Sequence, residues 1–157
     1  MTDFEQWKAL RVSRPGDVPA GTPLSWQADR AYEHSVRVFD ATLPPDFPHP
    51  VERGTAHDAV AELALRESIR RDVENGRGTR LHTALELGAT WAEVAAALDI
   101  SPDDARALLR QWAEGQHHLY LSDQEQGGEK PLGLSPDEHA SIVALTERGD
   151  NEGRVAP

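Results

Sequence analysis

The chain has 157 residues, with 27 acidic and 16 basic side chains, a formal net charge of −11 and no cysteine. Without cysteine, disulfides, zinc–cysteine clusters and thiol catalysis are excluded. The negative charge argues against a general nucleic-acid coat protein, whose affinity comes from neutralising phosphates. A chain of this length fits one ordinary domain, or a small domain with ordered extensions.

Residues 1–50 hold seven of the eleven prolines and are expected to form a proline-rich N-terminal arm with short helices. Long helices do not fit this spacing, because proline lacks a backbone donor and restricts the residue before it. Two short helices fit, from Asp3 to Arg11 and from Ser25 to Phe39, with Ser25 as N-cap. We expect the arm to pack through large aromatic side chains, namely Trp7, Trp26, Tyr32 and Phe39.

The first ten residues, MTDFEQWKAL, carry acids and no basic region before an apolar run, so no secretory signal is expected. No stretch of about 18 apolar residues is present, which argues against a membrane span. We therefore expect a cytoplasmic protein. Only Lys8 and Lys130 among the basic residues are lysine, as is typical of a GC-rich bacterial genome.

Residues 51–120 are expected to form the main helical domain. Thr55 is placed to cap a helix over 56–75, and the glycines of ENGRG are expected to end it. A shorter helix is predicted from Thr79 to Leu87.

Two further helices are predicted over 91–98 and 102–114, joined by a turn at 99–101. Thr90 and Glu93 have the spacing of a capping box, and Ser101 and Pro102 fit the N-cap and first position of the second helix. Each helix has one apolar face, formed by Trp91, Val94, Ala95 and Leu98 in the first and by Ala105, Leu108, Leu109 and Trp112 in the second. Such a pair is typical of a helix-turn-helix, although any compact helical bundle with a short turn gives the same pattern.

Residues 88–101, within LGATWAEVAAALDIS, resemble the first helix and turn of helix-turn-helix segments in DNA-binding proteins of GC-rich bacteria. The likeness covers about a tenth of the chain and concerns a motif only. It implies that the second helix faces the major groove with basic or amide side chains. The sequence departs from that pattern at Pro102, Asp103 and Asp104, and Asp99 stands where the turn usually has glycine.

Five polar side chains are the candidate DNA-binding residues. Arg106, Arg110 and Gln111 lie on the outer side of the second helix, where the arginines suit phosphate or guanine contacts. Arg77 and Arg80, with Gly76 and Gly78, suit a flexible loop that contacts phosphate. The alternative interpretation is that the acids cap the helix and the arginines merely solvate its surface.

Residues 121–157 form an acidic C-terminal segment with one predicted helix, which begins after Ser135, and a tail after Gly149 that we expect to fray. No part of the sequence alternates as a strand does, so the expected fold is all-α. His117 and His118 are adjacent and poorly placed to chelate a metal, and no catalytic motif stands out. We expect no cofactor, no metal and no enzymatic activity.

The sequence favours a helix-turn-helix DNA-binding protein, a transcriptional regulator or accessory factor, which as a homodimer would present two units to double-stranded DNA. The charge favours an alternative, an acidic helical adaptor that binds another protein such as a component of the transcription machinery. A third hypothesis is an acidic mimic of DNA.

Overall fold

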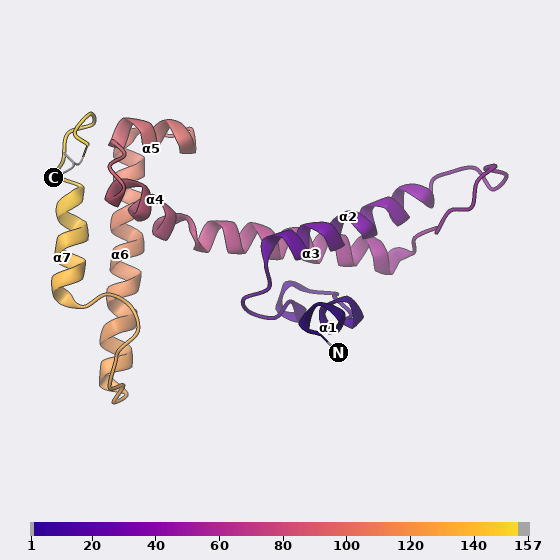
Figure 1. The fold of residues 1–157 in the computed structure, drawn as a ribbon, viewed down its shortest axis with the longest axis horizontal. Coiled ribbons are helices and arrows are strands. Elements are labelled where there is room, and N and C mark those ends of the chain that lie inside the picture. Colours follow the sequence, from indigo (N-terminus) through magenta and orange to yellow (C-terminus); the bar gives the residue numbers. More distant parts are fainter. Residues whose placement is uncertain (1, 154–157) are drawn as a thin grey trace. The chain divides into compact units, whose positions relative to one another are not determined.

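In the computed structural model, residues 2–153 are described, and their regular structure is helical throughout, with no strand among them (Figure 1). The all-α fold class is therefore confirmed. The chain divides into two units, an N-terminal unit (residues 1–75) and a C-terminal unit (residues 76–157). These units differ from the expected boundaries near residues 50 and 120, because the helix over 56–75 packs with the residues that precede it. None of the described helices is both long and apolar enough to cross a membrane.

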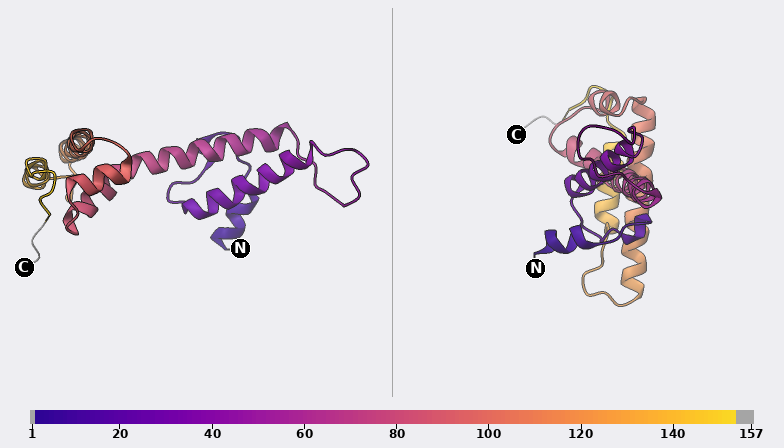
Figure 2. Two further views of the ribbon diagram at one scale, coloured as in Figure 1. Left: turned by 90° about the horizontal axis from the view of Figure 1, so that it is seen from above. Right: turned by 90° about the vertical axis from the view of Figure 1, so that its right-hand side faces the viewer.

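The N-terminal unit is built on a helical hairpin. It contains α1 (Asp3–Ala9), a short 3-10 turn (Pro15–Asp17), α2 (Leu24–Asp40) and α3 (Ala56–Asn75). Helices α2 and α3 lie side by side along most of their length (Figure 2). Its small apolar cluster consists of Trp7, Val12, Ala31, Ala64 and Leu65.

Two part-buried polar contacts join α2 to α3. The Nδ1 atom of His34 lies 2.9 Å from a carboxylate oxygen of Asp58, and both side chains are nearly buried. Nearer the start of α2, the side-chain amide nitrogen of Gln27 donates to the Asp72 carboxylate near the end of α3 at 2.8 Å. Because each pair joins α2 to α3 at a fixed position, these contacts set the register of the hairpin.

Asp58 also accepts hydrogen bonds at the start of α3, and the pKa of its carboxyl lies well below the usual range. The backbone N–H of Thr55, helped by the His34 ring and the Thr55 hydroxyl, lowers the pKa of Asp58 from 3.8 to about 2. Thr55 directly precedes α3, and its hydroxyl donates to the Asp58 carboxylate instead of accepting from a backbone N–H as the expected cap would.

We expect Asp58→Asn to lower the stability of the N-terminal unit at neutral pH and to matter progressively less in acid. Because the pKa is lower in the folded chain, the stabilisation is present above about pH 4 and is lost as pH falls towards 2. A shift of this size corresponds to about 2 kcal/mol. Denaturant unfolding of both proteins across this pH range checks it, and a difference that stays constant would contradict it.

The N-terminal helices differ from expectation in two respects. Helix α2 begins at Leu24 after Pro23, one residue before the expected Ser25 cap, and no side chain caps it. Trp7 is buried as expected, but Tyr32 is 70% exposed and Phe39 is 63% exposed. The expectation that all four aromatic residues pack is therefore wrong for these two, because α2 turns its buried face towards α3 through small and polar side chains.

The C-terminal unit is organised around a long helix. It contains α4 (Arg77–Glu86), α5 (Trp91–Leu98), α6 (Pro102–Glu125) and α7 (Pro136–Leu145). Helix α6 packs against each of the other three. Helix α7 runs back alongside it, as Figure 1 shows. The buried core consists of Leu81, Leu85, Trp91, Val94, Ala95, Ala105, Leu109, Ala113, Ile142 and Leu145.

A tight turn joins α5 to α6, as the sequence predicts. Thr90 and Glu93 form the predicted capping box at the start of α5. Asp99 ends that helix in the left-handed region at φ 53°, a conformation that aspartate tolerates better than most residues. The Ser101 hydroxyl then accepts from the Asp104 backbone N–H at 3.1 Å, and Pro102 occupies the first helical position.

Candidate functional site

Arg106, the first candidate DNA contact, is held inside the C-terminal unit. Its side chain is only 11% exposed, and its guanidinium lies over the ring of Trp91, 5.2 Å from the centroid. The Nη2 atom donates to the Arg148 carbonyl at 2.8 Å and to the Asp150 carboxylate at 2.6 Å. The Nη1 atom donates to Asp103 at 3.1 Å. The prediction that Arg106 projects freely towards DNA is therefore wrong.

Two of the residues that engage Arg106, Arg148 and Asp150, belong to a C-terminal segment, residues 146–153, which lies against the start of α5. The Ala92 backbone N–H donates to the Asp150 carbonyl at 2.9 Å. Gly153 lies close to the Gly88 carbonyl, and the indole N–H of Trp91 donates to the Leu145 carbonyl at the end of α7. A backbone donor at a helix N-terminus is a usual partner for phosphate, and here it is already bonded. The expected fraying after Gly149 is not observed up to residue 153.

Arg110 and Gln111 do reach the surface. The Arg110 side chain is 50% exposed and its Nη2 atom lies 3.9 Å from a carboxylate oxygen of Glu147. Gln111 is exposed. The outer face of α6 thus offers one partly screened arginine and one amide, rather than the pair of arginines that the sequence predicts.

Arg77 and Arg80 lie on α4 and do not form the predicted flexible loop. Both are exposed, and neither forms a salt bridge with another residue in the range 2–153. Gly78, between them, is buried in the contact of α4 with Trp112 on α6. The two glycines of ENGRG therefore do not open the chain, because Gly76 makes a brief break between α3 and α4 and Gly78 continues the second helix.

The C-terminal unit as a whole is acidic. Residues 76–157 carry 14 acidic and 7 basic side chains. Around the start of α6, the Asp103 side chain is 94% exposed and that of Glu147 is 80% exposed. Arg106 is bonded internally and Arg110, the guanidinium near Glu147, is half exposed, so exposed carboxylates outnumber exposed guanidinium groups beside this helix end.

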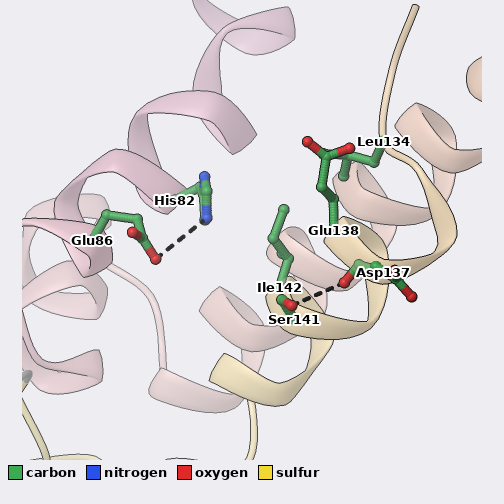
Figure 3. A pocket seen from close by; sticks show the side chains of 7 residues that line it. All are labelled: His82, Glu86, Leu134, Asp137, Glu138, Ser141 and Ile142. Carbon is green, nitrogen blue, oxygen red and sulfur yellow. Dashed lines mark hydrogen bonds and ion pairs between the residues drawn. The ribbon is translucent and has the colours of Figure 1, made fainter. Parts of the chain in front are cut away.

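A cleft of about 360 Å³ lies between α4 and α7 in the same unit (Figure 3). Ile142 and Leu134 form its apolar part, and His82 and Glu86 face them from α4. Glu138 stands at its edge, where the hydroxyl and backbone N–H of Ser135 lower the pKa of its carboxyl. An apolar floor with acids at its rim suits a cationic side chain better than an anion.

Histidines gather where α7 meets the second half of α6. The ring of His139 stacks on that of His117 at 4.8 Å, and its Nε2 atom lies 3.1 Å from a Glu114 carboxylate oxygen. His117 contacts the Leu134 carbonyl instead, at 3.0 Å. Within residues 2–153 no three acidic or histidine side chains are arranged to hold a metal ion.

Neither a protein-family model, nor a curated protein, nor a solved structure matches this chain. The features that sequence reasoning missed include two partners of Arg106, Arg148 and Asp150, which lie 42 and 44 residues further along the chain. No local pattern pairs them. The cleft residues were missed for the same reason, since α4 and α7 are far apart in sequence.

Proposed function

We propose that the protein is an acidic helical adaptor, whose C-terminal unit binds a basic surface of another protein. The observation that carries this proposal is the internal engagement of Arg106 by Asp103, Asp150 and the Arg148 carbonyl. A helix that reads DNA needs free donors near its N-terminus, because phosphate contacts supply most of the affinity. Here the arginine nearest the start of α6 is used within the fold, and the neighbouring acids remain exposed.

The negative charge of this surface favours a partner with a basic surface. Exposed carboxylates that include Asp103 and Glu147 attract arginine and lysine side chains and speed the encounter with a basic protein. The acidic rim of the α4–α7 cleft adds a place for a cationic side chain whose apolar stem contacts Ile142.

Titration with two labelled probes at low salt tests the proposal, one an arginine-rich peptide and the other a random-sequence DNA duplex. We expect the peptide to bind with an affinity that falls as salt rises, and the duplex not to bind. Asp103→Asn combined with Glu147→Gln should weaken peptide binding. The control, Glu125→Gln with Glu129→Gln, makes the same change in net charge elsewhere in the unit and should have a smaller effect.

DNA binding by a helix-turn-helix remains the second candidate, and four exposed side chains favour it. They are Arg77 and Arg80 on α4 and Arg110 and Gln111 on α6. If the duplex binds at low salt, and Arg77→Ala with Arg80→Ala weakens that binding and flattens its salt dependence, the adaptor proposal is wrong.

A further inference from the structure

Helix α2 carries an exposed apolar stripe made of Tyr32, Val36 and Phe39. Their spacing of four and three residues places the side chains on one face of the helix. Tyr32 is 70% exposed, Phe39 is 63% exposed and Val36 is 38% exposed. The opposite face of α2, which includes Ala31 and His34, is buried, and residues 2–75 of the N-terminal unit leave the stripe exposed.

The exposed stripe has the pattern of a helix face that packs against another surface. A solvated helix face is normally polar, and single exposed apolar residues are common, but an aligned aromatic pair with a valine between them is not. Three anchors at this spacing are what an amphipathic helix presents when it packs against another helix or into a groove.

The acidic residues beside the stripe indicate the charge that a partner needs. Asp29 and Glu33 are exposed and follow one edge of it, and Asp40 continues the same row at the end of the helix. The arginines of α2 offset them only in part: the charge of Arg30 acts on Glu33, and Arg37 is paired with another acid. Arg30 donates to the carbonyls of Trp7 and Leu10, and Arg37 pairs with Glu52 at 3.0 Å.

A second copy of the chain fits this edge poorly. In a two-fold symmetric pair of antiparallel helices, equivalent edges lie together, so Asp29 and Glu33 of one copy would approach Asp40 of the other. Like charges at that distance oppose association, whereas lysines or arginines on a different protein favour it.

We propose that the stripe on α2 is a docking surface for an amphipathic helix of a partner protein, with apolar side chains on Tyr32 and Phe39 and basic side chains along the acidic edge. The inference rests on the proposed adaptor function and gives the N-terminal unit its own part in it. The C-terminal unit supplies an acidic surface, and α2 supplies apolar anchors as well as charge.

The test uses the full chain and a labelled lysine–leucine peptide whose leucines repeat at helical spacing, together with a peptide of the same composition in scrambled order. The helical peptide should bind more tightly than the scrambled one. Tyr32→Ser combined with Phe39→Ser should weaken its binding by about tenfold or more, as for central anchors of an interface. Leu63→Ser is the control, because Leu63 is 69% exposed but lies on α3.

Asp29→Asn with Glu33→Gln gives a second measurement that leaves the apolar anchors in place. It should weaken binding of the helical peptide and reduce its salt dependence. Undiminished binding in both double variants would overturn the inference, as would a parent protein that does not distinguish the two peptides. A dimeric parent protein together with a monomeric Tyr32→Ser, Phe39→Ser variant in sedimentation would also overturn it, because the stripe would then bind a second copy of the chain. The duplex titration is independent of these variants, so failure of the adaptor proposal is recognised separately.

Discussion

Replacing Leu109 with alanine is expected to lower the free energy of unfolding of the C-terminal unit by about 2–5 kcal/mol. Leu109 is fully buried where α6 meets α5 and α7, so the shortened side chain leaves a cavity that the surrounding helices cannot fill. Leu108→Ala removes the same atoms from the neighbouring position, which is only partly buried, and should cost clearly less. Both residues lie on the apolar face that the sequence predicts.

Denaturant unfolding followed by tryptophan fluorescence measures both variants, because Trp91 and Trp112 lie in this unit. Equal losses for the two leucines would contradict the placement of the core on α6. Trp7 and Trp26 report on unfolding of the N-terminal unit. Because neither substitution lies in that unit, its unfolding transition should stay unchanged and serves as an internal control.

Gly78→Ala is expected to destabilise the same unit by about 1–3 kcal/mol, the usual cost of overfilling a packed contact. A Cβ atom on Gly78 would overlap the ring and the Cβ atom of Trp112, so α4 and α6 approach each other only because this residue has no side chain. The loss outweighs the preference of helices for alanine over glycine, which is worth about 1 kcal/mol.

Gly115→Ala is the matched control for that change. Gly115 also lies inside a helix, but nothing lies within 4 Å of the place where its Cβ would be. Alanine there should stabilise the protein by about 0.5–1 kcal/mol. If both substitutions raise the melting temperature, then Gly78 does not mediate the contact of α4 with α6.

The elements that sequence reasoning predicted well are those fixed by local chemistry. The capping box of Thr90 and Glu93, and the Ser101 and Ser135 caps, involve residues three positions apart, so the pattern is visible in the sequence. Helix α6 is longer than the predicted range 102–114, because Gly115 does not break it and the residues that follow continue the helix. The helix continues to Glu125, just before the Gly127–Gly128 pair.

What sequence reasoning could not predict depends on contacts between distant residues. The helix over 56–75 was placed with the later helices, but its buried pair of His34 and Asp58 joins it to α2. The role of Arg106 likewise depends on Asp150, which was expected to lie in a frayed tail. Periodicity reveals which face of a helix is apolar, and it does not reveal which neighbour covers that face or which acid neutralises a given arginine.

The position of Asp150 near the C-terminus also affects when each unit can fold during synthesis on the ribosome. Domains generally fold there from the N-terminus onward. All contacts within the N-terminal unit lie in the first 75 residues, so that unit can fold while the rest of the chain is still being synthesised. The C-terminal unit cannot. Its core needs Ile142 and Leu145, and Arg106 meets its carboxylate only after Asp150 has emerged. Until then the nascent chain presents an uncovered Trp91 and an Arg106 guanidinium with Asp103 as its only carboxylate partner, which makes this stage the most exposed to misfolding.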